Sequence, residues 1–172
     1  MKSVLISIRP EWCEKIVNGK KTIEVRKSAP KEVPFKAYIY CSKEKKQDDI
    51  IWAGAFGDRG KWNGHVIGEF ICDKVSMEFV GYRNHEPCYW YLLDGSCLTK
   101  DELMNYGEWA TLYGWHISNL KIYDKPKELS EFKTGCKGCK ERDTYHCKFY
   151  CYGERPLTRP PQSWQYVDEV EE

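Results

Sequence analysis

The sequence contains no apolar stretch of membrane-spanning length. Its 172 residues include no apolar run close to the roughly 18 residues that a transmembrane helix needs. The segment before Arg9 is also too short for the apolar region of a signal peptide, so we expect neither a secretory signal nor a membrane partner. A marked excess of positive or negative charge is missing as well, since the formal net charge is +1. That value argues against a strongly basic nucleic-acid coat but allows a local basic groove.

Aliphatic residues are scarce for a folded chain, and large aromatic residues compensate for them. The sequence has 12 Tyr and 7 Trp, which predicts a globular protein with an aromatic core and aromatic clefts. It also has 9 Cys, an odd number. Secreted disulfide-rich domains are usually smaller and have an even number, so we expect a cytoplasmic protein with reduced thiols and a possible metal site.

Segments typical of strands and helices follow one another along the chain. Alternating or β-branched residues predict strands over residues 4–9, 22–26, 35–41, 65–75 and 115–123. A helix is predicted to begin at Pro10 and to stop at Gly19. Thr99 and Glu102 form the capping-box pattern of a second helix that runs towards Tyr106. Short strands around two helices predict an α+β fold with a mostly antiparallel, barrel-like sheet.

A charged pattern lies where the first predicted helix gives way to a strand. It reads Gly19-Lys20-Lys21-Thr22-Ile23-Glu24-Val25-Arg26. Strand alternation places Glu24 and Arg26 on one face, and a turn at Gly19 lets Lys21 reach the same side. Lys21 and Arg26 suit a phosphate or an oxyanion, whereas Glu24 suits a proton or a base edge. The alternative is an exposed ion-pair ladder worth about 0–1 kcal/mol.

This pattern matches Gly-x-Lys-x-x-Glu-x-Arg, and with it the chain resembles the ASCH domains of the PUA-like superfamily. Further similar segments are SIRPEWCEKIVNG before the pattern, YCSK at 40–43 and GWHI at 114–117. The resemblance covers residues 1 to about 129, with insertions near 43–64 and 81–112. It implies a small pseudo-β-barrel with a cleft beside the pattern, and the length of the chain predicts a single domain over residues 1–172.

The resemblance also implies a function. Members of the family are thought to bind RNA or nucleotide-like ligands, and some are hydrolases. One group hydrolyses N4-acetylcytidine with a Lys and a Thr of the pattern and a separate acidic residue. Lys21 matches that Lys, but Glu24 stands at the position of that Thr, which favours binding over catalysis. In a hydrolase, Lys21 would activate a nucleophile or hold an oxyanion, and Glu24 would act as general base.

Outside the pattern, five more residues are candidate ligand contacts. They are Ser42, Lys43, Trp115, His116 and Trp164. Lys43 is expected to meet phosphate, and Trp115 or Trp164 to stack on a base. The alternatives are an ordinary strand end at Ser42 and Lys43, a hydrogen-bonded structural His116, and simple docking of the C-terminal segment through Trp164.

Four cysteines near the C-terminus have the spacing of a zinc site. They are Cys136, Cys139, Cys147 and Cys151. Two close pairs can supply the four tetrahedral ligands of a structural Zn²⁺, so we predict a small zinc knuckle within residues 135–155. His146 could replace its neighbour Cys147, and free thiols or two disulfides are the alternatives. A weaker candidate set consists of His85, Cys88 and Cys97.

Three hypotheses of function follow from these patterns. The first is a module that binds RNA or a nucleotide-like ligand in the cleft. The second is a small hydrolase acting on a modified nucleoside, such as an N4-acylcytidine, or on RNA. The third is a scaffold whose zinc knuckle binds a protein partner. A role for Lys21 and Glu24 separates the first two hypotheses from the third.

Overall fold

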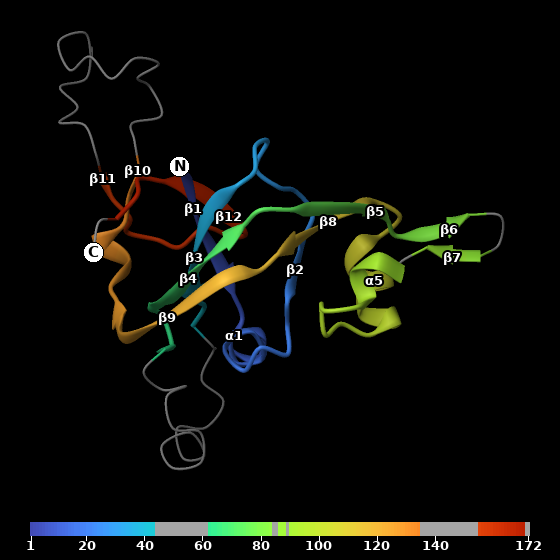
Figure 1. The fold of residues 1–172 in the computed structure, drawn as a ribbon, viewed down its shortest axis with the longest axis horizontal. Coiled ribbons are helices and arrows are strands. Elements are labelled where there is room, and N and C mark those ends of the chain that lie inside the picture. The colour runs from blue at the N-terminus through green and yellow to red at the C-terminus, as the bar shows by residue number, and fades with distance from the viewer. Residues whose placement is uncertain (44–61, 84–85, 89, 135–154, 171–172) are drawn as a thin grey trace, which may run out of the picture.

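A five-stranded mixed sheet forms the main body of the molecule (Figure 1). The computed structural model describes residues 1–43, 62–83, 86–88, 90–134 and 155–170. In spatial order the strands are β12 (Trp164–Val167), β1 (Lys2–Ile8), β3 (Phe35–Cys41), β4 (Val66–Cys72) and β9 (Ser118–Lys127). β1 and β3 run parallel, and the other neighbouring pairs run antiparallel.

A three-stranded antiparallel sheet continues from the first one. Its order is β2 (Ile23–Arg26), β8 (Thr111–His116) and β5 (Val75–Phe79). The chain passes from β4 to β5 through residues 73–74, and from β8 to β9 through Ile117. The two sheets are therefore joined by two continuous, bent stretches of chain, β4–β5 and β8–β9, as the green and yellow ribbons of Figure 1 show.

Short helices and ribbons complete the described fold. The helices are α1 (Pro10–Val17), α4 (Trp90–Leu93), α5 (Lys100–Gly107) and the 3-10 turn η1 (Leu129–Glu131). The small ribbons pair β6 (Gly81–Arg83) with β7 (Glu86–Cys88), and β10 (Lys133–Thr134) with β11 (Arg155–Pro156). None of the described helices is long and apolar enough to cross a membrane. The fold is thus rich in β-structure with few short helices, as the sequence predicts.

The predicted ends of both longer helices are confirmed. Pro10 occupies the first turn of α1, and Gly19 follows that helix with φ +69°, a left-handed conformation that suits glycine. At α5 the Thr99 hydroxyl accepts from the Glu102 amide at 3.2 Å, and the Thr99 amide donates to the Glu102 carboxylate at 2.7 Å. This reciprocal pair is the capping box.

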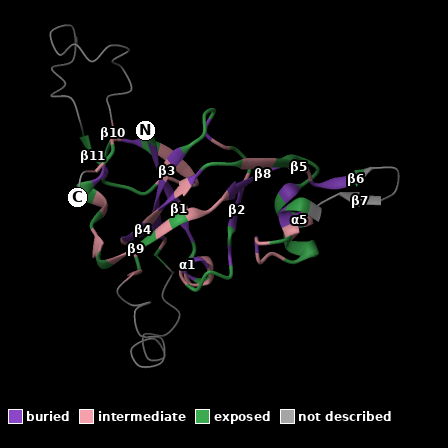
Figure 2. Ribbon diagram, in the orientation of Figure 1, coloured by how far each residue is buried: buried purple, intermediate pink, exposed green. Residues whose placement is uncertain are grey.

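The core lies on both faces of the five-stranded sheet (Figure 2). Val4, Ile6 and Ile8 pack on the side of α1. Leu5 points to the other face and packs with Tyr38 and Phe132. β1 is therefore apolar in both directions except near its ends, because it is a central strand covered on both sides.

Two strand predictions were wrong in the same way. The segment 65–75 is not one strand, because it breaks after Cys72, and 115–123 breaks at Ile117. In both places the chain leaves one sheet for the other, and the backbone amide of Ile117 donates to Thr22 instead of a ladder partner. β9 also includes Pro126. β9 is an edge strand of its sheet, where a proline is tolerated.

The β10–β11 ribbon closes the base of the segment 135–154. Lys133 pairs with Pro156, and Thr134 pairs with Arg155. The four predicted zinc ligands, Cys136, Cys139, Cys147 and Cys151, lie in this segment and outside the described residues. Because its two ends meet at one ladder, the segment leaves and re-enters the described fold at one point.

Candidate functional site

A cleft of about 710 Å³ opens beside the charged pattern. Its lining residues come from segments within 7–12, 21–26, 98–106 and 160–163, and from Ser42. Lys21, Glu24 and Arg26 all belong to this lining. These three residues thus line one cleft, and their role as ligand contacts stays a prediction.

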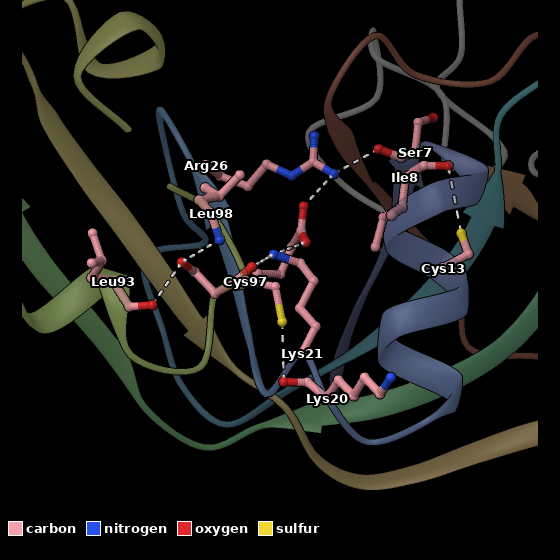
Figure 3. Close-up of polar contacts among 11 residues, drawn as sticks. Ser7, Ile8, Cys13, Lys20, Lys21, Arg26, Leu93, Cys97 and Leu98 are labelled. Atoms are coloured by element: carbon pink, nitrogen blue, oxygen red, sulfur yellow. Dashed lines mark hydrogen bonds and ion pairs between the residues drawn. The ribbon is translucent and has the colours of Figure 1, made fainter. Parts of the chain in front are cut away.

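Glu24 lies between two cations at the cleft, Lys21 and Arg26, which are labelled in Figure 3. Its carboxylate is 3.3 Å from Lys21 Nζ and 2.9 Å from Arg26 Nη2. Lys21 Nζ also donates to the Ser96 carbonyl at 2.6 Å, and Arg26 Nη2 donates to the Ser7 carbonyl at 2.6 Å. The charged group is thus tied to the backbone at two places far apart in the sequence.

Local structure explains why these side chains meet. Ile23 and Val25 of β2 face a hydrophobic cluster, so the alternate residues Glu24 and Arg26 face the cleft. After Gly19, the amide of Lys21 donates to the Lys15 carbonyl at 3.0 Å. The loop therefore wraps around the end of α1 and turns Lys21 inwards.

Burial contradicts the alternative of an exposed ion-pair ladder. The side chains of Lys21, Glu24 and Arg26 are 2%, 8% and 11% exposed. Burying charges costs solvation free energy that attraction between them offsets only in good geometry. Within the described part of the chain, Arg26 Nε has no hydrogen-bond partner, and Glu24 Oε2 has its ion pair with Lys21 at 3.3 Å but no further hydrogen bond. The contacts within the fold therefore do not saturate the charged group.

Several lining residues were not identified from the sequence. Trp12 is half-buried at the cleft, and Lys21 Nζ lies 5.2 Å from the centre of its ring. Glu102 and Tyr106 line the cleft from the segment 98–106. Trp12 also packs against the hydrophobic cluster on this side of the sheet. In the sequence, only its position seven residues before the charged pattern could have indicated a role in the cleft.

The segment 160–163 forms one wall of the cleft. The Ser7 hydroxyl donates to the Pro161 carbonyl at 2.7 Å, and the Ser7 amide donates to the Ser163 carbonyl at 2.9 Å. Pro160 and Pro161 stiffen this segment. Their contact with β1 depends on residues more than 150 positions away.

The two tryptophans predicted to stack on a ligand do not line the cleft. Trp115 is fully buried, and its ring meets Phe35 edge-on with centroids 5.0 Å apart. A ring enclosed in the core cannot stack on a ligand, so we correct that assignment. Trp164 lines a different cavity, where its indole Nε1 donates to the Ser28 hydroxyl at 3.0 Å.

The other predicted contacts divide in the same way. Ser42 lines the cleft. Lys43 is exposed, lies against Gly64, and is not among the lining residues. His116 Nε2 is 2.7 Å from the Ser76 hydroxyl, and burial together with the charge of Lys74 lowers the pKa of this histidine. These contacts support the structural alternative for His116.

The metal predictions stay predictions. Among the described residues, no group of three or more metal-binding side chains comes together. The predicted zinc ligands fall outside that part of the chain, and so does His85 of the weaker set. In the weaker set, Cys97 Sγ donates to the Lys20 carbonyl at 3.2 Å.

Comparison with known proteins identifies the family. The ASCH domain family matches residues 6–127. The chain therefore belongs to the ASCH domain family, as its resemblance in sequence had suggested. No curated protein matches the chain significantly.

The fold is also similar to solved structures. The crystal structure of ASCH from Zymomonas mobilis is 20% identical, with a TM-score of 0.58, over 98% of this chain and 89% of that one. Two point variants of the Zymomonas protein are each 18% identical, with TM-scores of 0.58 and 0.57. They cover 99% and 98% of this chain, and 93% and 90% of theirs. At these identities the likeness concerns the fold alone.

Proposed function

We propose that the cleft binds a nucleotide unit of RNA or a nucleotide-like ligand. The observation that carries this proposal is the burial of Lys21, Glu24 and Arg26 in the cleft lining. A surface ladder has no need to remove three charges from water, whereas a ligand-binding cleft typically holds a few charged groups in a largely buried lining. The cleft volume of about 710 Å³ also suits a ligand of nucleotide size.

The hydrogen-bond inventory indicates which ligand atoms the site favours. A lysine ammonium has three N–H donors, and contacts with Ser96 and Glu24 account for two of them. Two cations around one carboxylate leave an excess of positive charge. This arrangement suits a phosphate oxygen or a polarised carbonyl, while the lone pairs of Glu24 that its two ion pairs leave over suit an N–H or O–H donor.

Aromatic contacts are assigned to Trp12 and Tyr106 instead of Trp115 and Trp164. Both rings line the cleft, and Tyr106 is 37% exposed. Stacking on such rings contributes about 1–3 kcal/mol per base and tolerates any base. The ligand would then lie between the charged group and these rings.

The second candidate function is hydrolysis of a modified nucleoside or of RNA. The contact between Lys21 and Glu24 favours it, because a general base and a cation for an oxyanion would stand side by side. In this version Glu24 removes a proton from water and Lys21 holds the developing negative charge.

The proposed structural zinc is independent of the cleft. Cys136, Cys139, Cys147 and Cys151 would hold the ion within a segment whose ends the β10–β11 ribbon brings together. A knuckle of this kind also provides the third candidate function, a surface for a protein partner. It makes no use of Lys21 or Glu24.

Binding of short single-stranded RNA tests the main proposal. Affinity should fall with rising salt because phosphate contacts release counterions. Lys21→Met should weaken binding tenfold or more, whereas Lys125→Met, at an exposed lysine of β9, should leave it unchanged. Equal affinity of both variants, or no binding at low salt, contradicts the proposal.

A turnover screen with N4-acylcytidines and RNA distinguishes a hydrolase from a module that only binds its ligand. If product forms, Glu24→Gln should abolish turnover while the protein still binds the ligand. Ligand binding without formation of product supports the proposal that the protein is a binding module.

A further inference from the structure

Helix α5 contributes a second carboxylate to the cleft, apart from the buried charged group. Glu102 lines the cleft together with Asn105 and Tyr106, which follow it by three and four residues. Side chains at these spacings are neighbours on one face of a helix. The part of the lining that α5 supplies is therefore a carboxylate beside an amide and an aromatic ring.

The capping box holds the Glu102 carboxylate in a fixed orientation. Its Oε2 accepts from the Thr99 amide at 2.7 Å and from the Thr99 hydroxyl at 2.9 Å. Both of these bonds use the same oxygen, so Oε1 can accept from a ligand while the helix cap stays intact. A side chain that is already held in place loses little conformational freedom when it binds.

Glu102 is a hydrogen-bond acceptor at neutral pH. The hydrogen bonds from Thr99 lower the pKa of its carboxyl below the usual value, and the charges of Lys15 and Lys21 act in the same direction. An ionised carboxylate only accepts hydrogen bonds, and it repels a phosphate. In the proposed complex the phosphate therefore lies towards Lys21 and Arg26, and Glu102 meets an uncharged donor of the ligand.

A hydroxyl of the sugar is the donor that this arrangement favours. In a nucleotide the sugar joins the phosphate to the base. With the phosphate towards Arg26 and the base stacked on Tyr106, the sugar comes next to Glu102, which lies about one helical turn before Tyr106. Inside an RNA chain the 3′ oxygen belongs to the phosphodiester, so the 2′-hydroxyl is the donor that remains. An acidic side chain that accepts from this hydroxyl also recurs in dinucleotide sites.

We propose that Glu102 selects RNA over DNA by accepting a hydrogen bond from a ribose 2′-hydroxyl in the cleft. This inference rests on the proposed function of the cleft. The 2′-hydroxyl is the group by which a protein distinguishes RNA from DNA. A DNA strand leaves the carboxylate without that donor, but Glu102 is exposed and water replaces part of the lost contact. We therefore expect RNA to bind about tenfold more tightly than DNA of the same sequence.

Glu102→Gln tests this selection without removal of the helix cap. Glutamine also completes a capping box, and its one oxygen is engaged by the two Thr99 donors, so its NH₂ group faces the ligand in place of an acceptor. The measured quantity is the ratio of RNA to DNA affinity for one short single-stranded sequence, with uracil in both. The ratio cancels the general effect of one less negative charge, and it should fall about tenfold in the variant.

The chain offers a matched control. Glu131 holds the same capping position at η1, where its Oε1 accepts from the Glu128 amide at 2.7 Å, and it does not line the cleft. Glu131→Gln makes the same change of charge and should leave the ratio unchanged. The melting temperature and circular dichroism of both variants show whether the helices persist.

A series of RNAs with single 2′-deoxy positions tests the contact on the unaltered protein, whether or not the variant folds. One position should lose about tenfold in affinity when its 2′-hydroxyl is removed, and Glu102→Gln should abolish that sensitivity. Equal affinity for every deoxy-substituted strand overturns the inference. A sensitive position that stays equally sensitive in Glu102→Gln assigns the hydroxyl to another residue and also overturns it.

Lys21→Met separates this inference from the function on which it rests. If Lys21→Met weakens RNA and DNA alike while Glu102→Gln leaves their ratio unchanged, the cleft function stands and selection by Glu102 is refuted. Equal losses for RNA and DNA in Glu102→Gln place the carboxylate against a base and likewise refute it. An altered ratio in Glu102→Gln with full binding in Lys21→Met supports the ribose contact and refutes the proposed phosphate contact.

Discussion

Replacing Glu24 by Gln should destabilise the fold, because the change leaves two buried cations without their counter-charge. At an effective dielectric constant of about 20, charges at the two observed separations attract each other by about 5–6 kcal/mol per pair. Loss of solvation offsets much of this attraction, and breaking buried pairs typically costs about 3–5 kcal/mol. The Gln oxygen still accepts a hydrogen bond from Arg26. We therefore expect the free energy of unfolding to fall by about 3 kcal/mol.

Denaturant unfolding at neutral pH measures this change, and the chain offers a matched control. Lys27 Nζ and Glu108 Oε2 are 3.0 Å apart, but their side chains are 51% and 73% exposed. Glu108→Gln should therefore cost less than about 1 kcal/mol. If the two substitutions cost the same, burial of the charged group has no energetic consequence and our reasoning about the cleft is wrong.

A double variant tests the origin of the loss. Adding Lys21→Met to Glu24→Gln removes one of the two cations whose counter-charge has gone. The double change should then cost less than the sum of the single changes, by about 1 kcal/mol or more. Strict additivity would instead mean that Lys21 and Glu24 do not interact in the folded protein.

Three further predictions concern other sites. Burial lowers the pKa of His116 below its usual 6.5, so the unfolded chain binds the proton first and stability falls as the pH drops below about 6.5. His116→Gln should flatten the decline in melting temperature between pH 7 and pH 5, and an unchanged slope contradicts this. Burial raises the pKa of the Cys72 thiol to about 12. Iodoacetamide at pH 8 should therefore label the half-exposed Cys97 before Cys72, as mass spectrometry can show. Early labelling of Cys72 would count against the packing around it. Elemental analysis should find about one zinc per chain, and Cys139→Ser should remove it while the main unfolding transition stays. Substoichiometric zinc with freely titratable thiols would exclude the knuckle.

Local pattern was enough to predict the charged group of the cleft, but not its aromatic and proline-rich walls. The two-residue period of a strand places Glu24 and Arg26 on one side, and the structure confirms it through their ion pair at 2.9 Å. The capping box at Thr99 and the turn at Gly19 depend equally on neighbours in sequence. The same local rules misplaced the strand boundaries after Cys72 and at Ile117. Alternation describes an extended chain, but it does not indicate when that chain passes from one sheet to another.

The sequence by itself determined the extended segments β1, β2 and β3, the helices α1 and α5, and the gathering of three charges near one strand. Tertiary structure alone decided which of these side chains are buried and which remain available. Trp115 and Trp164 look alike in the sequence, yet one is enclosed in the core and the other lines a cavity. The Pro160–Pro161 wall and the Ser96 carbonyl reach Ser7 and Lys21 from distant parts of the chain. Burial depends on such distant neighbours, and no local pattern of residues records them.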